Sequence, residues 1–156
     1  MSPYMKLGWP VFLVFSLLFF ALTLSAPYLR SIGYDEDARA NYLVFTNFCH
    51  QIPERSFTVF GYPTAVCARC LGLYAGMLAG ALLYPLLGRK SMPAGWVLLA
   101  AMAPLAVDGF ASFVGLWDSG NTVRSATGFA FGLAIPYYVI PAVDRVLSAV
   151  FIRQRR

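Results

Sequence analysis

Four long apolar stretches alternate with polar segments along the chain. A helix that crosses a hydrocarbon core about 30 Å thick needs about 20 apolar residues, and each stretch comes close to that length. The pattern therefore predicts an all-α fold, a bundle of four transmembrane helices that forms a single integral membrane domain over residues 1–156. The predicted helices cover residues 9–26, 67–87, 94–116 and 125–150.

The segment between the first two apolar stretches, residues 27–66, is too polar to lie in lipid. We expect it to contain a short interfacial helix that ends at Pro53 and carries Cys49 on its apolar face. The expectation rests on residues that recur at the spacing of one helix face, namely Tyr42, Phe45, Cys49 and Ile52. The charges that keep this loop out of the hydrocarbon are Arg30, Asp35, Glu36, Asp37, Arg39 and Arg55.

Glycines recur at intervals of four residues in the second apolar stretch, at Gly72, Gly76 and Gly80. Such a spacing forms a flat stripe on which another helix can approach closely. The fourth stretch carries a matching pair, Gly128 and Gly132. We therefore expect the second and fourth helices to pack together through these glycines.

The composition also indicates a membrane protein. Apolar residues make up 59% of the chain and charged residues 12%, against about 25% charged residues in soluble domains. The net charge of +5 does not point to nucleic acid, because the basic residues gather near the ends of the predicted helices and not on a polar surface with interleaved aromatics. The predicted partner is the lipid bilayer. A homo-oligomer, a larger membrane assembly and a small-molecule ligand are left open.

The first apolar stretch, which follows Lys6, also has the pattern of a secretory signal peptide. A membrane helix is favoured because the apolar core is long, and because Ser25 and Ala26 lead directly into Pro27, which makes a poor cleavage site. With this helix retained, both termini lie on the same side of the membrane.

Positive charge predicts the orientation, because the cytoplasmic flanks of membrane helices hold an excess of Lys and Arg. The side that carries both termini has seven basic residues, against five on the other side. We therefore expect a protein of the cell membrane with both termini in the cytoplasm and the cysteine-bearing loop outside. The seven are Lys6, Arg89, Lys90, Arg145, Arg153, Arg155 and Arg156.

All three cysteines and the only histidine fall in one window, which makes Cys49, His50, Cys67 and Cys70 candidate metal ligands. A Cys-x-x-Cys pair offers two thiolates to one side of a tetrahedral ion, and a distant Cys-His pair can complete the shell. Adjacent residues on a helix point about 100° apart. Either the chain leaves helical geometry at Cys49 and His50, or only one of them is a ligand. Zinc, iron or copper suits such a set.

Other functions are compatible with the same window. A thiol-disulfide oxidoreductase linked to quinones is one alternative, since a helix N-terminus and Arg69 would favour thiolates at Cys67 and Cys70, with His50 as a proton acceptor. A small transporter and a structural role are further alternatives. Leu71 after Cys70 excludes covalent haem attachment. The sequence identifies no catalytic residue, so whether the protein is an enzyme is left open.

Asp108 lies inside the third apolar stretch, where a charge facing lipid would be costly. At about 1.5 Å per residue, it stands roughly 21 Å from the inner end of its helix, near Asn121 and Arg124 at the outer start of the fourth. We expect Asp108 and Arg124 to form an ion pair or to share a hydrogen-bond network. The supporting polar network predicted beneath the cysteines consists of Arg55, Arg69, Asp108, Asn121 and Arg124.

The motifs of this region also carry a family resemblance. Cys-His-Gln-x-Pro-x-Arg-Ser-Phe occupies 49–57 and Cys-x-Arg-Cys-x-Gly-x-Tyr-x-Gly occupies 67–76, followed by Asp108-Gly109 and Asn121-x-x-Arg124-x-x-Thr127-Gly128. This pattern resembles the prokaryotic predicted-membrane-protein family known as domain of unknown function two thousand and eighty-five. The resemblance implies a small multi-pass membrane protein and no particular activity.

Overall fold

The computed structural model describes residues 7–87 and 92–153, with side chains as far as Ala149. Four helical stretches in this part of the chain are long and apolar enough to cross a membrane: α1, α3, α4, and α5 with α6 together. The all-α membrane class is therefore confirmed. The elements are α1 (Gly8–Ser31), α2 (Asp35–Phe45), a 3₁₀ turn (Pro53–Arg55), β1 (Thr58–Val59), β2 (Tyr62–Pro63), α3 (Ala68–Leu87), α4 (Gly95–Phe113), α5 (Gly120–Ala134) and α6 (Pro136–Arg153).

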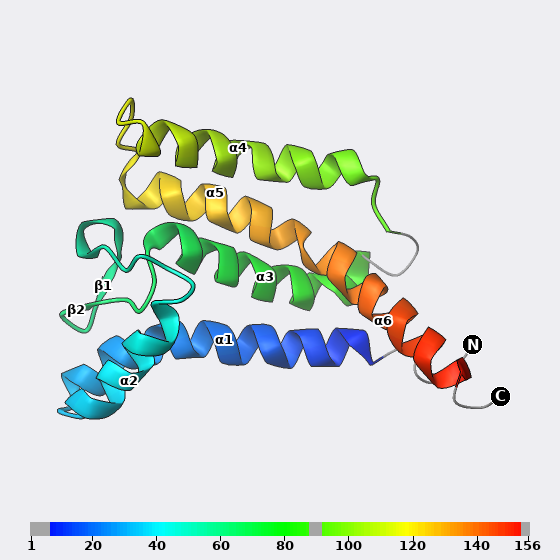
Figure 1. Ribbon diagram of the computed structural model, residues 1–156, viewed down its shortest axis with the longest axis horizontal. Helices are drawn as coiled ribbons and strands as arrows, with labels where there is room; N and C mark the ends of the chain where they lie inside the picture. Colours follow the sequence, from blue (N-terminus) through cyan, green and yellow to red (C-terminus); the bar gives the residue numbers. More distant parts are fainter. Residues whose placement is uncertain (1–6, 88–91, 154–156) are drawn as a thin grey trace.

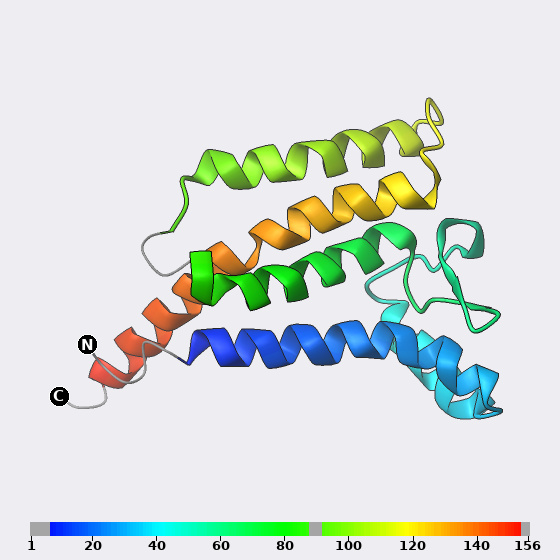
Figure 2. The ribbon, with the colours of Figure 1, turned by 180° about the vertical axis from the view of Figure 1, so that it is seen from behind.

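The long helices lie side by side in the order α1, α3, α5, α4 (Figure 1), and the view from behind shows the same order (Figure 2). The interfacial helix α2, the β1–β2 hairpin and the loop between α4 and α5 all lie at one end of this layer. The start of α1 and the end of α6 lie at the other end. The cysteine-bearing loop is therefore at the end of the bundle opposite to the start of α1.

The closest helix pair is α3 with α5, and glycines make the approach possible. A Cβ added to Gly72 would overlap the carbonyl oxygen of Ser125, and one added to Gly132 would overlap the carbonyl oxygen of Leu73. Because glycine has no side chain, the backbones of α3 and α5 touch directly at these positions, as stripes of small residues allow in membrane helices. The glycines that meet the opposite backbone are Gly72, Gly76, Gly80, Gly128 and Gly132.

Helix α1 is longer than predicted, because it continues through Pro27 to Ser31. Proline has no N–H to donate to the carbonyl four residues earlier, which here belongs to Thr23. That carbonyl accepts a hydrogen bond of 3.2 Å from the backbone N–H of Ala65 instead. Pro27 thus leaves an acceptor free on α1 that anchors the segment leading to Cys67.

The interfacial helix is present, but its bounds differ from the prediction. Helix α2 spans Asp35–Phe45, whereas the sequence pattern had suggested a helix that continued to Pro53. Acidic residues favour a helix start at Asp35, because they face the positive end of the helix dipole. The chain leaves the helix after Phe45, although the N–H of Cys49 still donates to the Phe45 carbonyl oxygen at 2.9 Å. Pro53 begins the 3₁₀ turn and does not end α2.

The sequence pattern did not predict the hairpin formed by β1 and β2. The β1–β2 hairpin turns at Phe60 and Gly61, which both have positive φ, as the tight hairpin turn of this kind requires. The fourth span consists of two helices, because α5 ends at Ala134 and α6 starts at Pro136. Helix α6 crosses back to α1, where Asp144 Oδ1 accepts a hydrogen bond of 2.8 Å from the Gly8 N–H.

Candidate metal centre

Three cysteine sulfurs meet at the end of the bundle that carries α2. Cys49 comes from the loop after α2, Cys67 directly precedes α3, and Cys70 lies in its first turn. The three Sγ atoms lie within 4.8 Å of one another, and those of Cys67 and Cys70 are 3.5 Å apart. With metal–sulfur bonds of about 2.3 Å, a tetrahedral ion needs sulfurs about 3.8 Å apart. The three thiols can therefore close on one ion with small side-chain movements.

The backbone around Cys49 is held in place by Gln51. Its Nε2 donates to the carbonyl oxygens of Tyr42 and Ala65, each at 2.7 Å. Gln51 itself has a φ of 52°, a left-handed conformation that non-glycine residues adopt at a cost. The two hydrogen bonds offset that cost and tie the loop to α2 and to the segment before Cys67. Gln51 was not among the predicted site residues, although its place in the Cys49-His50-Gln51 motif was the available signal.

The sulfurs lie in apolar surroundings. Cys49 is 7% exposed and packs with Phe45, Ala65 and Val66, while Cys67 and Cys70 are half-buried against the same cluster. Cys49 Sγ also accepts a hydrogen bond of 3.1 Å from the Cys67 N–H. A negative charge at Cys49 is thus favoured by backbone and thiol donors.

Thiol pKa values follow this arrangement. Hydrogen bonds from the thiols of Cys67 and Cys70 lower the pKa of Cys49 to about 2. The Cys67 thiol donates a hydrogen bond to Cys49, and this bond raises the pKa of Cys67. Of the three sulfurs, that of Cys49 therefore has the surroundings that most favour a thiolate.

His50 lies outside the sulfur cluster. Its side chain is exposed, whereas that of the adjacent Cys49 is buried. In residues 7–87 and 92–153, the group of metal-ligating side chains consists of Cys49, Cys67 and Cys70. The structure thus brings together three of the four predicted ligands and leaves the imidazole at the surface.

The ion pair beneath the cysteines is Arg69 with Asp108. Arg69 Nε donates to Asp108 Oδ2 at 2.8 Å, and Nη2 donates to the same oxygen. The predicted ion pair of Asp108 with Arg124 does not form, because Arg124 instead binds Asp118 Oδ1 at 2.6 Å. Because Gly128 has no side chain, α5 packs directly on the backbone carbonyl of Arg69 in the first turn of α3. From this position the guanidinium of Arg69 reaches Asp108 on α4. Ser112, which was not predicted, lies 3.4 Å from Arg69 Nη2.

The other network residues connect the cysteine motif to α5. Asn121 Nδ2 donates to the carbonyl oxygen of Ser56 at 3.0 Å, and Asn121 Oδ1 lies 3.5 Å from Arg124 Nη1. Arg124 is 3% exposed, so its charge depends on these contacts and on Asp118. Arg55 is exposed and its side chain forms no ion pair within the described residues.

The fold and this site define a multi-pass α-helical membrane protein with a three-cysteine cluster at one end of its bundle. The chain belongs to the family described as predicted membrane protein, DUF2085, which it matches over residues 49–138. This match covers the cysteines, the Arg69–Asp108 pair and the whole of α5, and it confirms the resemblance seen in the motifs.

Two archaeal proteins are similar to the chain. An uncharacterized protein of Methanocaldococcus jannaschii is 37% identical over 155 residues, which covers 94% of this chain and 99% of that protein. An uncharacterized protein of Methanothermobacter thermautotrophicus is 37% identical over 93 residues, covering 58% of this chain and 83% of that one. No solved structure matches the chain.

Proposed function

We propose that the thiolates of Cys49, Cys67 and Cys70 bind one metal ion at the outer end of the membrane bundle. The observation that carries this proposal is the convergence of three sulfurs from two separate segments to within 4.8 Å of one another. Zinc, iron or copper accepts thiolate ligands. Three protein ligands leave the fourth tetrahedral position for solvent or a substrate, as in catalytic zinc sites. The exposed imidazole of His50 lies outside this set of three ligands.

Metal content tests the proposal directly. Protein purified without chelator is expected to carry about one zinc, iron or copper atom per chain, measured by elemental analysis. Cys67→Ser removes one of three ligands and is expected to abolish the metal. His50→Ala is the matched control, because the imidazole lies outside the cluster, and it is expected to keep the metal. A chain without metal, with a mass about two units below that of the reduced protein, would contradict the proposal.

That contrary result would support the second candidate function, thiol-disulfide exchange. The sulfurs of Cys67 and Cys70 lie 3.5 Å apart, so a disulfide can close with little backbone movement and leave Cys49 as a free thiol. The helix dipole at the N-terminus of α3 favours thiolates there, whereas the hydrogen bond to Cys49 raises the pKa of the Cys67 thiol. The transporter hypothesis is weaker, because Asp108, its candidate ion-binding residue, is paired with Arg69. A structural role for the cysteines is the outcome if neither metal nor disulfide is found.

The orientation is proposed from charge and is tested separately. We expect a membrane-impermeant thiol reagent, applied to intact cells after mild reduction and chelation, to label the three cysteines. Half-buried Cys67 and Cys70 are expected to react before buried Cys49. Labelling confined to inverted vesicles would place the cysteine end in the cytoplasm and reverse the proposed topology.

A further inference from the structure

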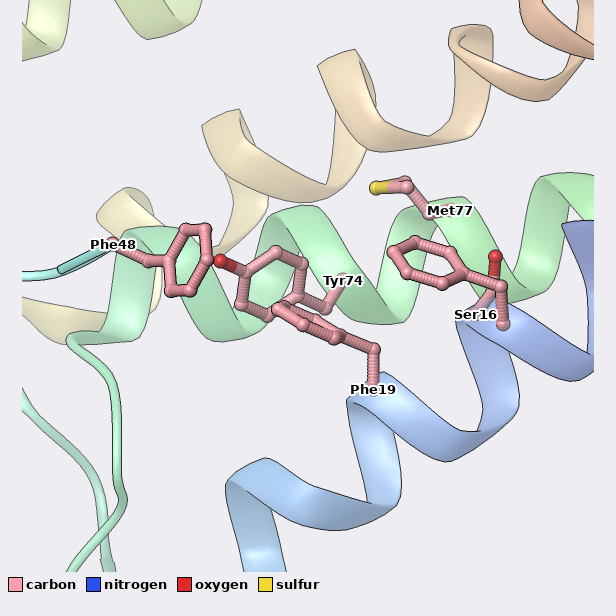
Figure 3. A pocket seen from close by; sticks show the side chains of 6 residues that line it. Ser16, Phe19, Phe48, Tyr74 and Met77 are labelled. Atoms are coloured by element: carbon pink, nitrogen blue, oxygen red, sulfur yellow. The ribbon is translucent and has the colours of Figure 1, made fainter. Parts of the chain in front are cut away.

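A cavity of about 220 Å³ lies on the flank of the bundle between α1 and α3 (Figure 3). Phe15 and Phe48 at its rim are 50% and 60% exposed, so the cavity opens to the surroundings of the helices. Both helices are long and apolar enough to span the membrane, which makes those surroundings lipid. The residues that line the cavity are Phe15, Ser16, Phe19, Phe48, Tyr74 and Met77.

The walls are aromatic. The ring of Phe19 lies at the centre, with its centroid 4.9 Å from that of Tyr74, 5.3 Å from that of Phe15 and 5.9 Å from that of Phe48. Aromatic rings bind other flat rings by stacking and by edge-to-face contact. The interior thus suits a flat ring better than a branched or charged group.

One hydrogen-bond donor serves this cavity. The Ser16 hydroxyl already donates its hydrogen to the Phe12 carbonyl oxygen at 2.8 Å. The Tyr74 hydroxyl forms no hydrogen bond with the described residues of the chain, and Figure 3 shows it beside the ring of Phe48. The Tyr74 oxygen is not among the fully buried polar atoms that lack a partner, so the hydroxyl is accessible and can donate to a ligand that supplies an oxygen acceptor.

The cavity also adjoins the cysteines. Tyr74 follows Cys70 by one helical turn on α3, and both Phe19 and Tyr74 pack against the cluster that contains Cys49. A molecule bound in the cavity is therefore separated from the sulfurs by a single layer of side chains.

We propose that this cavity binds the ring of a lipid-soluble quinone, with one carbonyl oxygen accepting a hydrogen bond from Tyr74 and the tail lying in the bilayer. Entry from lipid selects a membrane-dissolved molecule. The volume is below the range of about 300–1,000 Å³ typical of sites that enclose a whole drug-sized ligand, which fits a ring with its tail outside. A phospholipid acyl chain would leave the Tyr74 hydroxyl without a partner. The binding does not depend on whether the thiolates hold a metal.

The test uses the full-length protein in phosphatidylcholine nanodiscs with a photoreactive azidoquinone, and cross-linked peptides are mapped by mass spectrometry. Decylubiquinone serves as the competitor, because its fully substituted ring does not add to thiols. Cross-links are expected on α1 and α3 around Phe19 and Tyr74. Tyr74→Phe, which removes one hydrogen bond, is expected to weaken competition by decylubiquinone by about 3- to 10-fold.

Three controls make the result specific. Tyr84→Phe is the same change on the same helix, away from the cavity, and is expected to leave affinity unchanged. Decylbenzene, which has no carbonyl, is expected to compete weakly and equally for the natural protein and for Tyr74→Phe. Cys67→Ser is expected to bind the quinone normally even if it loses metal. Equal affinity of Tyr74→Phe and the natural protein, or cross-links spread over the lipid face of α4, would overturn the proposal.

Discussion

Replacing Asp108 with alanine is expected to lower the free energy of unfolding by about 3–5 kcal/mol. The substitution leaves the guanidinium of Arg69 without its carboxylate, and that side chain is only 22% exposed. A buried charge that loses its partner costs more than the pair contributes when intact. The measurement is the unfolding midpoint in mixed micelles, followed by helical circular dichroism.

A double-mutant cycle identifies the partner of Asp108. Arg69→Ala combined with Asp108→Ala is expected to be less destabilised than the sum of the single variants, with a coupling energy of about 2–3 kcal/mol. The cycle of Asp108→Ala with Arg124→Ala serves as the matched comparison, because Arg124 binds Asp118 instead. Its coupling is expected to stay below about 1 kcal/mol. A larger coupling for Arg124 than for Arg69 would contradict the observed pairing.

Replacing Gly132 with alanine is expected to destabilise the bundle by about 3 kcal/mol, the upper end of the cost of overpacking. The added methyl would overlap the carbonyl oxygen of Leu73 on α3. Backbone atoms cannot rotate away as a side chain can, so the two helices must separate. The first turn of α3 would shift with them, and a loss of bound metal is expected to accompany the loss of stability.

Gly109→Ala is the matched control for this substitution. Gly109 also lies inside a membrane helix, but an added Cβ would meet no atom within 4 Å. Because glycine in a helix interior is less favourable than alanine, stability is expected to stay the same or rise by about 0.5–1 kcal/mol. If both glycine variants behave alike in the micelle unfolding assay, close packing of α3 on α5 does not stabilise the protein.

Part of the candidate site could be predicted because its members carry strong local signals. The cysteines are few and grouped in one window, so their convergence needed only a loop that returns to the start of α3. The glycine spacing likewise identified the faces of α3 and α5 that meet. The first signal is a grouping of rare residues and the second is a period within a helix, and a sequence displays both directly.

Other features had no such signal. The end of α2 at Phe45 depends on the hydrogen bonds that Gln51 makes to two distant carbonyls. The use of the free Thr23 carbonyl by Ala65 requires α1 and the loop to be already adjacent. The aromatic cavity combines side chains from α1, α3 and the loop at Phe48, which lie far apart in the sequence.

The sequence by itself determined the helices that cross the membrane and the gathering of cysteines and buried charges at one end of them, because hydropathy and helical period are local properties. The tertiary structure decided which partners meet there: Asp108 with Arg69, Arg124 with Asp118, and the three sulfurs without His50. Side chains reach only a few ångströms, so such pairings depend on the offset and rotation between neighbouring helices. Those quantities result from packing such as the glycine contact of α3 with α5, and no single segment encodes them.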